Sequence, residues 1–229
     1  MQQQTVVLVP FGGGRDHGFS DLIEVLRYQL SLLVVELRRH AQLDIGRSLL
    51  ATSALHQGAD VVVFIDSDML FDPLDVERIA NVARETRGVV GAPYSERRMG
   101  GHLTSSPRKD IEEMTFFEGG GLYPSESVIA MGFTAIHREA FERLHSLPEY
   151  AERRCNEGLV RPYFQKATID GYWFPEDASF CHAVRSVGVS THLDTRIRVK
   201  HVGDYAFGVE DCVRTLPDAT TLKKRVRPP

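Results

Sequence analysis

Two continuous apolar runs constrain the fold of this chain more than any other feature. They are TVVLV at 5–9 and DVVVFI at 60–65, both rich in β-branched residues and followed by turn-forming or acidic residues. A strand that lacks alternating polar positions has both faces buried, which is typical of a parallel sheet covered by helices. We therefore predict an α/β fold with a mostly parallel central sheet.

Helical patterns alternate with these strands and predict helices on both faces of the sheet. Residues 31–37 fit either a continued helix or a second strand, and the need for a partner strand favours the strand. Residues 149–171 lack periodicity and are interpreted as a flexible lid or acceptor loop. The expected helices are one capped by Ser20-Asp21, 44–57, one from Asp72, 138–147 and 176–187; the other expected extended segments are 89–92, 128–136 and 191–201.

The length of 229 residues suits one α/β domain, with no internal repeat and no linker. Within a single domain 1–229, we expect two halves, 1–95 and 96–208, and a C-terminal tail (209–229). This organisation resembles the Rossmann-like arrangement in which ligands lie outside the carboxyl ends of strands.

Charge and cysteine content narrow the class of partner. A formal net charge of −4 gives no general reason to hold nucleic acid or an anionic membrane surface, so small-molecule partners are favoured. Cys155, Cys181 and Cys212 are odd in number and widely spaced, which indicates neither a disulfide framework nor a metal knuckle. No segment approaches the roughly 20 apolar residues of a transmembrane helix, and the N-terminus lacks a signal-peptide pattern. We predict a cytoplasmic protein.

Asp66 and Asp68 directly follow the most apolar strand. Two carboxylates at a strand end can hold a hard divalent cation, Mn²⁺ or Mg²⁺, which in turn neutralises a diphosphate. The alternative is that they are turn or helix-capping aspartates. Because Asp72 supplies the cap of the next helix, we favour a metal site.

The glycine-rich segment 11–18 follows the first strand. It matches neither GxxxxGK[ST] nor GxGxxG, so a plain loop is the simpler interpretation. It can still fold over a nucleotide, with Arg15 meeting a phosphate or base. We take Pro10 and Arg15 as candidate nucleotide contacts.

Six motifs in order make the chain resemble GT-A-fold glycosyltransferases, particularly bacterial and phage-type members with a DxD motif. The similarity spans most of the chain. The motifs are DIGRS (44–48), GADVVVFIDSDMLFDP (58–73), GAPY (91–94), MGFTAIHREAFERL (131–144), PEDASFCHAVRSVG (175–188) and KHVGDYAFG (200–208).

The resemblance implies a nucleotide-sugar donor, UDP-sugar or GDP-sugar, bound with a divalent metal on the half 1–95, and an acceptor bound on the half 96–208. Asp68 and Asp66 would hold the metal, and His201 is a further candidate ligand. Arg47 matches the arginine of an ARN-like motif and would contact the nucleotide, although Ser48 replaces the usual asparagine.

For the acceptor side, Asp177 of the ED pair matches the expected general base, and Glu176 is the neighbouring alternative. Structural interpretations also exist: acids are favoured in the first turn of a helix, and His201 fits a partly buried strand end. Tyr172 and Trp173 form either a stacking platform for an acceptor sugar or a cap on the core, and their place beside the ED pair favours the platform.

We therefore expect a metal-dependent, hexosyltransferase-like enzyme that moves a sugar from a nucleotide-sugar to a glycan or other hydroxyl acceptor with inversion. Two alternatives stay open. One is a sugar-nucleotide pyrophosphorylase, although its Thr-Arg and lysine signature is missing near Arg15. The other is a catalytically silent carbohydrate-binding protein on the same fold.

Overall fold

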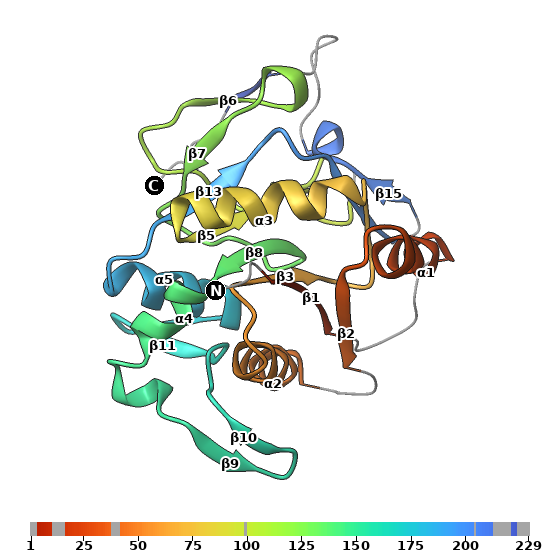
Figure 1. Ribbon diagram of the computed structural model, residues 1–229. Coiled ribbons are helices and arrows are strands. Elements are labelled where there is room, and N and C mark those ends of the chain that lie inside the picture. The colour runs from red at the N-terminus through yellow and green to blue at the C-terminus, as the bar shows by residue number, and fades with distance from the viewer. Residues whose placement is uncertain are drawn as a thin grey trace.

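A computed structural model describes residues 4–10, 17–37, 42–98, 100–203, 205–212 and 221–223. Its centre is a seven-stranded sheet with the order β2-β1-β3-β8-β5-β13-β7 (Figure 1). These strands are β1 Thr5–Pro10, β2 Leu33–Leu37, β3 Val61–Ile65, β5 Val89–Gly91, β7 Leu122–Pro124, β8 Phe133–His137 and β13 Thr191–Asp194.

The sheet is mixed but mostly parallel. β1 pairs in parallel with β2 and β3, and β13 pairs in parallel with β5. β8 lies antiparallel between β3 and β5, and β7 is antiparallel to β13. Five of the seven strands therefore run in one direction, which confirms the predicted sheet.

Helices cover both faces of the sheet. α1 (His17–Glu24) and α3 (Leu74–Thr86) lie on one face, and α2 (Leu43–His56), α4 (Arg138–Leu144) and α5 (Glu176–Ser186) on the other (Figure 1). Alternate strand residues serve the two faces. Val6 and Leu8 pack with the α2 side, while Val7 and Val9 pack with the α3 side. This alternation of buried contacts explains why the strand sequences are apolar at every position.

Smaller elements surround the main sheet. β4 (Met69–Phe71), β14 (Val199–Val202) and β15 (Ala206–Phe207) form a three-stranded sheet, and the others pair as β9 with β10, β11 with β12, and β6 with β16. Their bounds are β6 Glu113–Thr115, β9 Arg153–Cys155, β10 Gly158–Val160, β11 Ala167–Ile169, β12 Tyr172–Phe174 and β16 Thr221–Lys223. A π-helix spans Val25–Gln29, and short 3-10 turns span Phe117–Gly119, Pro148–Tyr150 and Val209–Asp211.

Two boundaries differ from the sequence prediction. α1 begins at His17, so Ser20 and Asp21 lie inside this helix and do not cap it. β8 begins at Phe133, not at Val128, because side chains bond the preceding backbone: Ile129 donates to Cys181 Sγ at 3.3 Å and Ala130 to Ser105 Oγ at 2.9 Å.

The interpretation of 149–171 as a flexible loop is wrong. The segment folds into the β9-β10 hairpin and the first strand of the β11-β12 hairpin, and it buries Tyr163 and Phe164 in the core. Hydroxyl groups of α2 anchor it, since Ser48 Oγ accepts from the Phe164 N–H at 3.0 Å. Such anchoring by a distant helix leaves no periodic signal in the segment itself.

Parts of the expected C-terminal tail are also ordered against the domain. Val209 and Cys212 are buried, and β16 pairs antiparallel with β6. Among the described residues, no helix is long and apolar enough to cross a membrane.

Candidate functional site

Asp66 lies at the carboxyl end of β3, beside the start of β8. Its N–H donates to the Gly132 carbonyl at 3.0 Å, while the Gly132 N–H donates to the Tyr94 hydroxyl at 3.0 Å. A Cβ on residue 132 would stand 2.4 Å from that hydroxyl oxygen, which is too close for any side chain. The glycine of the MGF segment therefore makes room for the buried tyrosine of GAPY, and this close packing fixes the end of the acidic strand.

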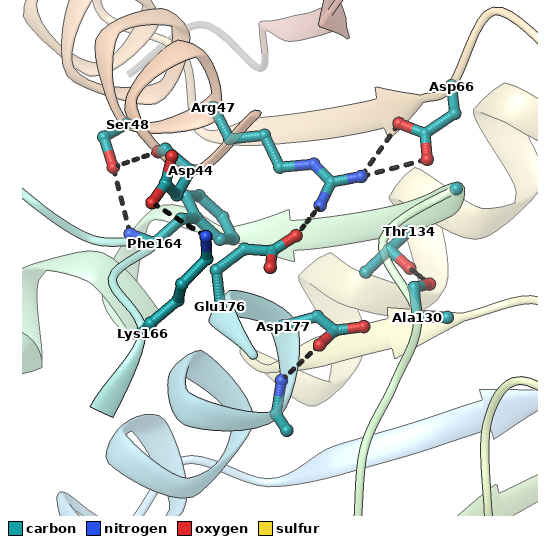
Figure 2. A network of polar contacts seen from close by, with 12 residues as sticks. Asp44, Arg47, Ser48, Asp66, Ala130, Thr134, Phe164, Lys166, Glu176 and Asp177 are labelled. Atoms are coloured by element: carbon teal, nitrogen blue, oxygen red, sulfur yellow. Dashed lines mark hydrogen bonds and ion pairs between the residues drawn. The ribbon is translucent and has the colours of Figure 1, made fainter. Parts of the chain in front are cut away.

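Arg47 joins that strand end to α5 (Figure 2). One terminal nitrogen of its guanidinium lies 2.9 Å from both oxygens of Asp66, and the other lies 2.7 Å from Glu176 Oε1. The arginine is only 3% exposed. Burial alone lowers the pKa of Arg47, but the carboxylates of Asp66 and Glu176 outweigh it and raise that pKa. We call Arg47, Asp66 and Glu176 the buried network.

Asp177 lies beside this network, in the first turn of α5. Its Oδ1 accepts from the Ala178 N–H at 2.7 Å, and among the described residues it is not paired with an arginine (Figure 2). Partial burial, with the adjacent Glu176 charge as a smaller cause, raises the pKa of Asp177 above its usual value. A carboxyl group with these properties is a better proton acceptor than an ordinary aspartate.

A second cluster forms around Asp68. β4 starts directly after this residue and pairs antiparallel with β14, in the register that sets His201 opposite Met69. His201 Nε2 consequently lies 3.5 Å from Asp68 Oδ2. Arg97 forms an ion pair with Asp68, and its Nε donates to His201 Nε2 at 2.9 Å. We call Asp68, Arg97 and His201 the open cluster, because the Arg97 side chain is 49% exposed.

The hydrogen bonds of His201 define its tautomer. Because Nε2 accepts from Arg97, Nδ1 carries the hydrogen and donates to the Ser95 carbonyl at 3.1 Å. Burial lowers the pKa of His201, and the nearby Arg97 charge also lowers it, so the ring is neutral at pH 7. A backbone carbonyl on one ring nitrogen is the usual way to direct the lone pair of the other toward a metal.

The donor set fits a divalent cation at the open cluster. Asp68 Oδ1 is buried and has no hydrogen-bond partner in the described part of the chain, and His201 Nε2 lies 3.5 Å from Oδ2 of the same carboxylate. Carboxylate and imidazole groups both suit Mn²⁺. Within the described ranges, no three His, Cys, Asp or Glu side chains are gathered into a metal-binding group, and Asp66 is directed to Arg47.

The remaining predicted residues lie as follows. Pro10 is buried at the end of β1, opposite Leu37 of β2. Arg15 lies outside the described residues. Tyr172 and Trp173 of β12 are 73% and 65% exposed, so they do not cap the core.

Tyr94 and Arg97 were missed by the sequence prediction. Both follow β5, whose carboxyl end lies at the same sheet edge as that of β3, because the two strands run in the same direction on either side of β8. Two consecutive arginines after the GAPY strand were the available signal, since acidic strand ends need nearby positive charge.

Comparisons with known proteins bear on the fold. The crystal structure of A197 from STIV is 17% identical, with a TM-score of 0.59 over 98% of this chain and 96% of that chain. GalNAc-T7 with UDP, GalNAc and Mn²⁺ is 14% identical, with a TM-score of 0.47 over 90% of this chain and 44% of that chain. The 2-C-methyl-D-erythritol 4-phosphate cytidylyltransferase from Thermus thermophilus is 13% identical, with a TM-score of 0.44 over 94% of each chain.

No family model matches the chain, and no curated protein matches it significantly. At this level of identity, the likeness to A197 concerns the fold. The predicted α/β fold with a mostly parallel central sheet and helices on both faces is confirmed.

Proposed function

We propose that this protein is a metal-dependent glycosyltransferase that moves a hexosyl group from a UDP-sugar or GDP-sugar to an acceptor hydroxyl with inversion. One observation carries the proposal: Asp68 Oδ2 and His201 Nε2, an oxygen and a nitrogen of the kinds that bind divalent cations, lie 3.5 Å apart near the carboxyl end of β3. A strand end in an open α/β sheet is where such folds bind phosphorylated ligands.

Asp68 and His201 would hold the cation, and Asp66 lies beside them on the same turn. A bound Mn²⁺ or Mg²⁺ supplies Lewis-acid stabilisation of the departing nucleoside diphosphate. Pro10 ends β1 next to β3 in the sheet, which supports its predicted place beside the nucleotide. The contact with Arg15 stays a prediction.

In the proposed mechanism, Arg47 acts on the donor site indirectly, whereas the sequence predicted a direct contact with the nucleotide. Because Arg47 is almost completely buried and already bonds two carboxylates, it acts through Asp66 and Glu176 and not on the donor itself. It would hold the acidic strand end and the start of α5 at a fixed separation. We therefore treat Arg47 as a positioning residue.

Asp177 would act as the general base on the acceptor hydroxyl. Its raised pKa and the lack of an arginine partner among the described residues support this role. Glu176 is the weaker candidate, because its Oε1 already accepts a hydrogen bond from the buried Arg47. Adjacent helical residues also point about 100° apart, so the two carboxylates are not interchangeable.

The acceptor would rest near the β11-β12 hairpin. Ser179 Oγ of α5 accepts from the Ala167 N–H at 3.1 Å and donates to the Phe174 carbonyl at 3.3 Å, which ties both strands to the helix that carries Asp177. Exposed Trp173 then offers an aromatic face for a sugar ring. A glycan is the acceptor class that this surface favours.

A product assay separates the proposal from its rivals. With a panel of nucleotide-sugars and Mn²⁺, we expect release of a nucleoside diphosphate that increases when sugar acceptors are added. Consumption of a nucleoside triphosphate with release of pyrophosphate would instead identify a pyrophosphorylase. Sugar binding without turnover of any donor would identify a silent binding protein. The cytoplasmic location stays a prediction, supported by three free cysteines.

A further inference from the structure

Arg97 lies where the cation of the proposed site would lie. Its guanidinium forms an ion pair with Asp68 and donates to the Nε2 lone pair of His201. These two side chains are the proposed metal ligands. A guanidinium and a metal cannot both occupy the same Nε2 lone pair. Binding of a divalent cation to these residues therefore requires Arg97 to move.

The structure lets Arg97 move. Its side chain is 49% exposed, whereas Arg47 is almost completely buried. The stem of Arg97 runs past Gly203 of the HVG motif: a Cβ on residue 203 would lie 3.3 Å from Arg97 Cδ. Because residue 203 is a glycine, the alkyl stem of Arg97 has space to change its conformation, and a larger residue there would reduce this space.

Stability alone is a weak reason for this arginine to be here. An ion pair with a half-exposed arginine adds little to the stability of the folded chain, because solvent screens the two charges. The pair also leaves Asp68 Oδ1 buried without a partner among the described residues, which a purely structural pair would be expected to satisfy. The ion pair between Arg97 and Asp68 is therefore better suited to an exchange of partners than to stabilising the fold.

We infer that Arg97 is a donor-binding residue of this site. In the metal-free protein it bonds Asp68 and His201, and when a divalent cation binds these two residues it bonds the phosphates of the donor instead. This inference rests on the proposed function. It assigns the phosphate contact to an exposed arginine whose five N–H donors match phosphate oxygens. Both roles belong to one side chain because a cation and its diphosphate occupy neighbouring positions.

The inference predicts two opposite changes for Arg97→Ala. Without nucleotide, Mn²⁺ affinity measured by electron paramagnetic resonance should rise about fivefold, because no guanidinium competes for Asp68. In saturating Mn²⁺, the affinity for UDP or GDP measured by calorimetry should fall about tenfold or more, because a charge-assisted bond to phosphate is lost. A merely structural role would not change these affinities in opposite directions.

Arg98→Ala is the matched control. Arg98 is the next residue, its side chain is 63% exposed and it pairs with Glu96, not with Asp68. This variant should leave both affinities unchanged. Unchanged or weaker Mn²⁺ binding in Arg97→Ala, or unchanged nucleotide affinity, would overturn the inference.

Asp68→Asn separates failure of the inference from failure of the proposed function. If Asp68→Asn loses Mn²⁺ binding while Arg97→Ala behaves as wild type, the metal site stands and the role of Arg97 is wrong. If Asp68→Asn binds Mn²⁺ normally, the metal site itself is wrong and the inference falls with it.

Discussion

The buried network and the open cluster both pair an arginine with an aspartate of the same DSD turn, yet they differ in freedom. Arg47 is held by two carboxylates from different elements and is shielded from solvent. Arg97 is half exposed and contacts Asp68 and His201, the two proposed metal ligands. Proteins use the first arrangement to fix geometry and the second to exchange partners. The DSD turn thus divides into a fixed aspartate and an exchangeable one.

The largest expected effect is at Asp177, which lies beside the buried network. Asp177→Asn should lower transfer by roughly 10² to 10⁴ while leaving Mn²⁺ and nucleotide affinity unchanged, because a positioned base is lost but the donor site is not. Steady-state and binding measurements on the purified variant check this. Near-normal turnover, or a product that keeps the donor's anomeric configuration, would contradict the assignment.

Glu176→Gln is the matched control, and the pH dependence of activity distinguishes the two carboxylates. A base must be unprotonated, so activity should rise with pH through the pKa of Asp177, which burial raises. Glu176→Gln should keep this acidic limb, whereas Asp177→Asn should abolish it. If only Glu176→Gln lost the acidic limb of the pH profile, the general base would be Glu176 of the buried network and not Asp177.

The second prediction compares the two arginines directly. Arg47→Met should lower the free energy of unfolding by about 3 kcal/mol, because Asp66 and Glu176 are left without their shared cation in a mostly buried place. Arg97→Met should change it by less than about 0.5 kcal/mol, as for an ordinary surface substitution. Urea denaturation of both variants gives the comparison. Equal stability losses would remove the distinction between a fixed and an exchangeable arginine.

A smaller effect is expected at the hairpin. Trp173→Ala should raise the acceptor Michaelis constant by roughly fivefold without changing donor affinity, since an exposed aromatic face contributes on the order of 1 kcal/mol to sugar stacking. Tyr172→Ala is the control on the neighbouring, oppositely directed position of β12. An unchanged acceptor Michaelis constant for Trp173→Ala would place the acceptor elsewhere.

The sequence predicted the parts of this molecule that depend on local pattern. The apolar runs of β1 and β3 predicted buried strands, and residues 31–37 do form β2. The antiparallel β8 could not be predicted, because strand direction depends on pairing between residues about 70 positions apart, such as Val62 with Ile136.

The same limit applies to the candidate site. The DSD turn and the ED pair are visible as motifs, but the partner of each carboxylate is not. That Asp66 pairs with Arg47 and Asp68 with Arg97 depends on how α2 and the loop after β5 reach the end of β3. Such contacts arise only from the assembled sheet, so the two arginines after GAPY could not show which of them pairs with Asp68.

Titration of UDP and GDP into the protein, with and without Mn²⁺, tests the metal-dependent donor site most directly. Wild-type protein should bind a nucleoside diphosphate tightly only with Mn²⁺, and Asp68→Asn should lose that dependence because the cation loses its charged ligand. Metal-dependent nucleotide binding that is unchanged in Asp68→Asn would contradict the proposed function.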